Sequence, residues 1–180
     1  MVKIGNAFFL FIGFLAVFLS AATLAGGGGG YKLSTGDVLS ISVFNEPDLS
    51  VEEVRVATTG VISFPLLGEV KVVGLTAKQV EQRLTELLLD GYLKHPKISV
   101  SIKEYRLFFV HGEVRSPGGY NYQDGLTVRK AIVLAGGFSE RASKEKITLV
   151  SENAPGEPAK VDLNHPVRPG DVIMVGESFF

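Results

Sequence analysis

The side chains that most often carry catalysis are scattered through this sequence. The three histidines, His95, His111 and His165, are far apart, and residues typical of turns flank each of them. No Gly-x-Ser-x-Gly turn is present for a nucleophilic serine, and no two histidines stand at zinc-ligand spacing. The chain has no cysteine, which excludes a thiol nucleophile, a disulfide and a thiolate metal site. We therefore predict no catalytic residue, no metal ligand and no cofactor.

Cleavage of a sugar polymer would need two carboxylates that face each other across a cleft. Glu113 and Asp124 flank a predicted hairpin, but their spacing in the sequence does not set the distance between them. We keep a carbohydrate-active enzyme as the third of three hypotheses.

Tyrosines are the better candidates for contact with sugars, because a flat ring with one polar end suits the face of a sugar. Four of them, Tyr92, Tyr105, Tyr120 and Tyr122, could serve in this way. Tyr120 and Tyr122 share one side of a predicted strand, since side chains two residues apart point the same way. We name these two as candidate sugar-stacking residues. Packing in a core or an interface is the alternative.

The charge balance limits the choice of partners. Lysine and arginine number 18 against 19 aspartates and glutamates, and the formal net charge is −1. Binding to a phosphate backbone needs a basic face, so we expect no nucleic-acid partner. Lipoproteins are acylated on a cysteine, and none is present, so we expect the chain not to be lipidated.

The first 25 residues have the pattern of a secretory signal peptide. Lys3 is their only charge, Ala7–Leu19 is apolar, and small residues precede a possible cleavage after Ala25. An uncleaved membrane anchor is the alternative, and both interpretations place the body of the chain outside the cytoplasm. Residues 26–30 are glycines, which we interpret as a flexible linker because no Lys-Ser/Thr follows them as in a phosphate-binding loop.

Residues 31–105 are predicted to form a first module of strands and one helix. Thr76 and Gln79 make a capping box, which predicts a helix that ends at Asp90-Gly91. Its apolar stripe consists of Val80, Leu84, Leu87 and Leu88. Alternating apolar residues predict strands at 39–43, 54–56, 62–64, 69–73 and 98–102. We expect the helix to cover one face of a small mixed sheet.

Residues 106–176 are predicted to form a second module. Strands are expected at 107–110, 120–122, 147–150, 161–163 and 172–175. Thr127 caps a helix that stops at Gly136-Gly137, and residues 151–160 are expected to be a loop because they contain two prolines and a glycine. A hairpin, a helix and further strands in this order are typical of a β-grasp domain. The predicted fold class is α+β, a small mixed-sheet domain plus a β-grasp domain.

Turn residues mark the boundaries of these elements. Each marker glycine is expected where the chain turns or takes a positive φ. Asp37 and Asp171 each follow a glycine and precede a strand, so we expect them to cap turns. The fold markers are Gly36, Asp37, Gly60, Pro65, Gly68, Gly74, Pro117, Gly118, Gly136, Gly137, Gly170 and Asp171. Residues 177–180 are expected to be a tail, or part of a contact between protomers through Phe179-Phe180.

Several blocks of the sequence resemble one known family. The opening Tyr-Lys-Leu-Ser-Thr-Gly-Asp-Val-Leu at 31–39 resembles the Y-x-L-x-x-G-D-x-L of bacterial outer-membrane polysaccharide export proteins. The stretches 60–76 and 95–100 are similar to the export domain of that family. Later blocks resemble the soluble-ligand-binding β-grasp (SLBB) domain that follows the export domain there; these are 110–118, 134–137 and 168–173.

The resemblance implies a non-enzymatic periplasmic protein, associated with the outer membrane, that forms a homo-oligomeric ring for translocation of capsule or exopolysaccharide. The implied partners are the polysaccharide chain and an inner-membrane polysaccharide copolymerase. Family members often carry a lipidated cysteine, further β-grasp domains and a C-terminal pore helix, which are not found here, and Thr59 replaces a frequent aspartate. We therefore expect this short form to need a separate outer-membrane barrel protein. The alternative function is a periplasmic β-grasp module of another secretion or uptake system that binds a small glycan or DNA.

Overall fold

An antiparallel sheet of three strands organises the first half of the chain. Strand β1 (Val38–Val43) lies in the middle, between β2 (Val51–Arg55) and β5 (Ile98–Glu104). A short 3-10 helix, η1 (Pro47–Leu49), precedes β2, and a separate hairpin is formed by β3 (Val61–Phe64) and β4 (Gly68–Lys71). The strands predicted here are all present, with bounds shifted by up to three residues.

Helix α1 (Ala77–Leu89) begins at the predicted capping box, which is confirmed. The backbone N–H of Gln79 donates to Thr76 Oγ1 over 3.3 Å, and the backbone N–H of Thr76 donates to Gln79 Oε1 over 2.8 Å. Val80, Leu84 and Leu88 are buried against the sheet in one apolar cluster. Burial of each such side chain stabilises the fold by about 1.5–3 kcal/mol, so this stripe holds the helix on the sheet.

The second half of the chain forms a five-stranded sheet in the order β7-β6-β10-β8-β9. Its elements are β6 (Phe108–Gly112), β7 (Gly118–Tyr120), α2 (Val128–Leu134), β8 (Ala142–Ser151), β9 (Ala154–Lys160) and β10 (Val172–Glu177). The first and last of these strands, β6 and β10, pair in parallel, and the other pairs are antiparallel. This is the order expected of a β-grasp domain, and it confirms the α+β class. The sheet of the second module is therefore the mixed one, because it contains the parallel pair of β6 and β10. The described strands of the first module pair antiparallel.

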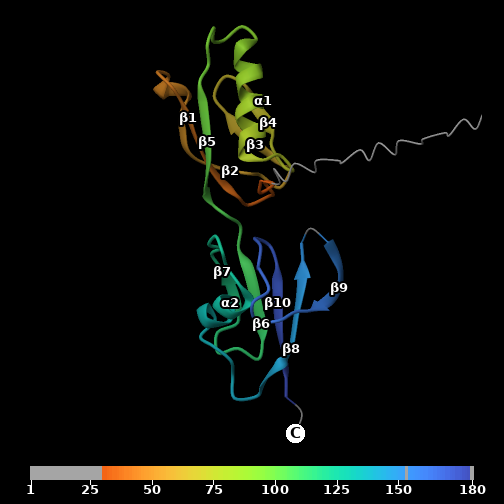
Figure 1. Cartoon of the computed structure of the whole chain (residues 1–180). Helices are drawn as coiled ribbons and strands as arrows, with labels where there is room; N and C mark the ends of the chain where they lie inside the picture. The colour runs from red at the N-terminus through yellow and green to blue at the C-terminus, as the bar shows by residue number, and fades with distance from the viewer. Residues whose placement is uncertain (1–29, 153, 179–180) are drawn as a thin grey trace, which may run out of the picture.

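One face of the five-stranded sheet packs in the core with α2. Phe108 and Val110 on β6 are buried with Ile132 of the helix. The alternate residues on the other face are exposed, with Phe109 and Met174 each 46% accessible. Figure 1 shows the two modules one beyond the other, joined by the short segment between β5 and β6.

Two predictions in the second module are wrong. Residues 154–160 form β9, not a loop, and residues 161–163 form no strand. Strand β9 lies at the edge of its sheet, where an outward-facing backbone nitrogen needs no partner, so prolines are tolerated there. Its ladder with β8 is irregular, with a register shift between Leu149 and Ser151. Beyond β9, the N–H of Val161 still donates to the carbonyl of Ile147 over 3.0 Å.

This computed structural model describes residues 30–152 and 154–178. The predicted signal peptide, residues 26–29 of the predicted linker, and Phe179-Phe180 lie outside the described residues. Within the described ranges, no helix has the length and apolar character needed to cross a membrane. Among the marker glycines, all but Gly118 have a positive φ, and Gly118 instead opens β7.

Gly112 is a position in the second sheet where a side chain would not fit. Its φ is +84°, and a Cβ there would lie 2.1 Å from the carbonyl oxygen of Val175 on the neighbouring β10. Gly112→Ala should therefore lower the free energy of unfolding by more than about 2 kcal/mol, from backbone strain and the clash together. The matched control is Gly118→Ala in the same sheet, where a Cβ meets nothing within 4 Å. Urea unfolding of both variants checks this; equal stabilities would contradict it.

Candidate functional site

The two modules are held together by Arg106, which stands in the short link between β5 and β6. Its backbone N–H donates to Asp37 Oδ1 over 2.9 Å, and its guanidinium Nη1 lies 3.6 Å from Asp37 Oδ2. Nε donates to Glu152 Oε2 over 2.5 Å, and Nη1 also contacts the hydroxyl of Tyr31. Glu152 belongs to the β8–β9 turn, which points toward the first module (Figure 1). Arg106 thus connects the start of the first module to a turn of the second. We call its contacts with Tyr31, Asp37 and Glu152 the clamp.

Asp37 is fully buried, and its carboxylate is satisfied by several donors. Both oxygens accept from the hydroxyl of Tyr31, at 2.9 and 2.8 Å, and Oδ2 also accepts from the backbone N–H of Ser34 over 2.8 Å. The bond to Ser34 caps the turn before β1. A buried carboxylate is costly unless it is paired and hydrogen-bonded, so these donors make the burial of Asp37 possible.

Asp171 caps the equivalent turn before β10. Its Oδ2 accepts from the backbone N–H of Arg168 over 2.8 Å, and it is also buried. Within the described residues its Oδ1 has no hydrogen-bond partner. The preceding Gly170 lies against the clamp, because a Cβ on it would lie 2.7 Å from Arg106 Nε and closer still to Glu152. Its φ of +86° favours glycine there, and a Cβ would also displace the side chains of Glu152 and Arg106.

Three tyrosines from separate parts of the chain form a row beside this clamp. The rings of Tyr31 and Tyr105 stack edge to face with centroids 4.9 Å apart, and those of Tyr105 and Tyr122 do so at 5.1 Å. Burial raises the pKa of the Tyr105 and Tyr122 hydroxyls, and the charge of Asp124 raises them further. The row joins the N-terminal segment, the inter-module link and the loop after β7.

The tyrosine row lines a cavity of about 550 Å³ at the junction. Lys32, Asp124 and Arg168 contribute charged groups to its wall. We call it the junction cavity, defined by Gly30, Tyr31, Lys32, Tyr105, Tyr122, Asp124, Arg168 and Pro169. Its volume is typical of small-ligand sites, which commonly lie between domains.

The structure separates the two tyrosines that the sequence grouped. Tyr122 lies in the junction cavity, whereas Tyr120 packs its ring against Phe108 with centroids 5.9 Å apart and hydrogen-bonds the carbonyl of Ser116. Tyr31, which opens the Y-x-L-x-x-G-D motif, also lies in the junction cavity, although no local sequence pattern indicates contact with sugars. Tyr92, by contrast, is half exposed after α1.

The carboxylates considered for polymer cleavage have separate surroundings. Glu113 Oε2 accepts from Ser139 Oγ over 2.6 Å, and Asp124 lies in the junction cavity. In residues 30–152 and 154–178, no three His, Cys, Asp or Glu side chains are grouped so that they could hold a metal ion.

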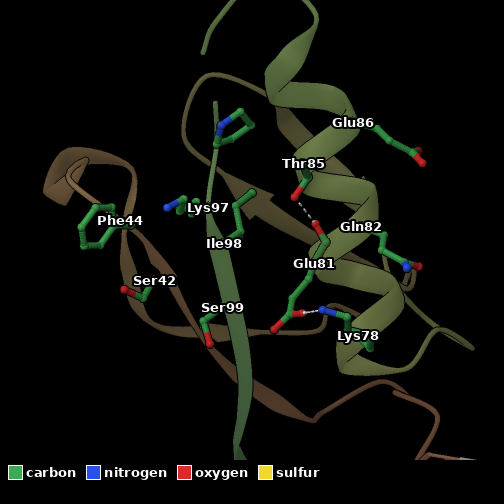
Figure 2. Close-up of a pocket in the computed structure, with 11 residues that line it drawn as sticks. Ser42, Phe44, Lys78, Glu81, Gln82, Thr85, Glu86, Lys97, Ile98 and Ser99 are labelled. Atoms are coloured by element: carbon green, nitrogen blue, oxygen red, sulfur yellow. Dashed lines mark hydrogen bonds and ion pairs between the residues drawn. The ribbon is translucent and has the colours of Figure 1, made fainter. Parts of the chain in front are cut away.

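A second hollow lies along α1 and β5, with a volume of about 710 Å³ (Figure 2). Both of its lysines have contacts within the chain: Lys78 Nζ donates to Glu81 Oε2 over 2.7 Å, and Lys97 lies 5.7 Å from the centroid of the Phe44 ring. The backbone N–H of Val100 donates to Glu81 Oε1 over 3.0 Å. The bonds from Lys78 and Val100 lower the pKa of Glu81. Because β5 is an edge strand, Glu81 occupies a backbone group that a foreign strand would need.

These features define a two-module α+β protein with a cavity at the junction of the modules. Residues 26–103 match the family described as polysaccharide biosynthesis/export protein, and residues 107–162 match the SLBB domain. The chain therefore contains a polysaccharide biosynthesis/export domain followed by an SLBB domain. The resemblance read from the sequence motifs is confirmed.

Curated relatives carry names from the same field. The exopolysaccharide production protein ExoF of Rhizobium meliloti (strain 1021) is 33% identical over 106 residues, 58% of this chain and 25% of ExoF. The EPS I polysaccharide export outer membrane protein EpsA of Ralstonia solanacearum is 31% identical over 134 residues, 61% of this chain and 35% of EpsA. The polysialic acid transport protein KpsD of Escherichia coli is 30% identical over 93 residues, 51% of this chain and 16% of KpsD. The chain thus spans about a third or less of the length of each.

The clamp predicts unequal roles for the two buried aspartates. Asp37→Ala should lower the free energy of unfolding by about 3–5 kcal/mol, because it leaves Arg106 and several other donors without their partner. Asp171→Ala removes one capping bond together with an unsatisfied oxygen, so its cost should be about 1 kcal/mol. Urea unfolding followed by circular dichroism measures both. Equal losses would contradict the assignment of the clamp to Asp37.

Tyr31 predicts a pH dependence at the alkaline end. Burial first, and then its hydrogen bond to Asp37, raise the pKa of its hydroxyl well above the ordinary 10.0. The unfolded chain therefore ionises first, so stability is retained below pH 10 and falls as the pH rises above it. Tyr31→Phe should make this fall shallower, whereas Tyr92→Phe, at an exposed position, should leave it unchanged. Urea unfolding from pH 8 to 11 tests this, and an unaltered slope in Tyr31→Phe would refute it.

Proposed function

We infer that this chain is a non-enzymatic component of a machine that exports capsule or exopolysaccharide. The observation that carries this inference is the order of the domains, an export domain at 26–103 followed by an SLBB domain at 107–162. The names of the relatives support it, since they are a polysaccharide production protein, an export protein and a transport protein. The predicted signal peptide is consistent with work in the periplasm, and the name of EpsA supports association with the outer membrane.

The chain works as a homo-oligomeric ring through which the polymer passes. Support comes from the exposed face of the five-stranded sheet, where Leu107, Phe109 and Met174 are between 41% and 46% accessible. Apolar side chains that gather on an exposed face commonly mark a contact surface. The partners are the polysaccharide chain, an inner-membrane copolymerase and a separate outer-membrane barrel protein.

Deletion of the gene tests this function. We expect extracellular polymer to fall to near background while polymer accumulates inside the cell, because synthesis continues without an exit. Expression of the whole chain should restore export. The control is the same chain without residues 1–25, which should be stable in the cytoplasm and should not restore export. Polymer is measured in the medium and in the periplasmic fraction. Normal export in the deletion strain would overturn the proposed function.

A further inference from the structure

The junction cavity carries more positive than negative charge on a chain that is slightly acidic overall. Lys32 and Arg168 face one carboxylate, Asp124, whereas the formal net charge of the chain is −1. Asp124 lies close enough to Tyr105 for its charge to raise the pKa of that hydroxyl beyond the effect of burial. Among residues 30–152 and 154–178, neither Lys32 nor Arg168 makes an ion pair. Two cations remain for a ligand with negative charge.

The tyrosines supply the rest of a sugar site. Tyr31, Tyr105 and Tyr122 are each half-buried, so part of each ring faces the cavity. Edge-to-face stacking at 4.9 and 5.1 Å holds the three rings in place before any ligand arrives. An aromatic ring offers an apolar face to the C–H groups of a sugar, while its hydroxyl and the Asp124 carboxylate can hydrogen-bond sugar hydroxyls.

We propose that the junction cavity binds an acidic sugar residue, a uronic acid or another carboxylated sugar, of the polymer that is exported. This rests on the proposed function and names the chemical class of its cargo. The sugar ring lies against the tyrosine row, and its carboxylate is held by Arg168 and Lys32. Arginine and lysine form charge-assisted hydrogen bonds to a carboxylate, which are the stronger kind.

The hollow between α1 and β5 is the weaker choice for such a ligand. There Lys78 is paired with Glu81, and Lys97 lies over the ring of Phe44. A carboxylated sugar would have to break these contacts before it gained new ones. In the junction cavity the cations are available and the rings are held by their stacking on one another, so less order has to be created on binding.

Transit also limits how tightly the site binds. A polymer that passes through must be attracted but also released, as in channels where ions bind weakly enough to leave. Dissociation constants of about 1 mM, roughly −4 kcal/mol, suit this purpose. Because the contacts are partly exposed ion pairs, binding weakens as salt screens them.

The test is a titration of the full chain, purified in mild detergent, with tetragalacturonic acid. The same tetrasaccharide with its carboxyl groups reduced to alcohols is the matched neutral probe. The chain has no tryptophan and five tyrosines, of which three line the cavity, so tyrosine fluorescence reports occupancy. Ligand-observed saturation-transfer NMR gives a second readout. We expect the acidic probe to bind at least about fivefold more tightly than the neutral one, and less tightly as salt rises.

The variant Lys32→Gln/Arg168→Gln should bind the acidic probe about tenfold more weakly. Both residues are exposed, so folding should be unaffected, and circular dichroism checks this. The matched control is Lys94→Gln/Arg115→Gln, which removes the same charge at exposed positions outside the cavity and should bind as wild type. Equal affinity for both probes, wild-type affinity in the cavity variant, or no binding of the acidic probe at 10 mM, a concentration of about ten times the expected constant, would each overturn the proposal.

The export assay in the deletion strain separates this site from the proposed function. Restored export by a wild-type chain that binds no uronate would discard the cavity site and keep the export role. Uronate binding by a chain that does not restore export would count against the export role. If the wild-type chain both binds uronate and restores export, the cavity variant should export less polymer than the Lys94→Gln/Arg115→Gln control. Equal export by the two variants would show that the site is not on the transport path.

Discussion

The arrangement of the two modules depends on the pairing of Asp37 with Arg106. Asp37 is completely buried at the turn into β1, and its charge requires partners in a place that water does not reach. Arg106 is only 10% exposed as a side chain and stands in the covalent link. It also binds Glu152 in the second module. The buried carboxylate of Asp37 therefore fixes the position of the link through Arg106. Arg106 in turn holds Glu152, next to the end of β8.

The same turn is used twice around this pair. Gly36-Asp37 leads into β1, and Gly170-Asp171 leads into β10. Each of these strands is the middle strand of its sheet. Both glycines also face Arg106, since a Cβ on Gly36 would lie 3.6 Å from Arg106 Cβ and one on Gly170 would lie 2.7 Å from Nε. The central strands of both sheets thus start at the junction, and the clamp orients one sheet relative to the other.

Local signals predicted the elements, and long-range contacts made the site. Helix α1 was predictable because Thr76 and Gln79 cap it within one turn and its stripe repeats at helical spacing. Strand β9 was missed because it contains prolines, which are tolerated at the edge position that local sequence does not reveal. The clamp was missed for a similar reason. Arg106 meets Tyr31 and Asp37 across 75 and 69 positions, and no periodicity encodes such a pairing.

The position of the junction cavity ties its occupancy to the arrangement of the modules. Tyr31 and Lys32 come from the first module, and Tyr122, Asp124 and Arg168 come from the second. A ligand that fills the cavity contacts both, so it binds the closed junction better than one whose modules have separated. Mass action then stabilises the closed arrangement in proportion to occupancy. The clamp and a ligand in the cavity would therefore favour the same arrangement of the two modules.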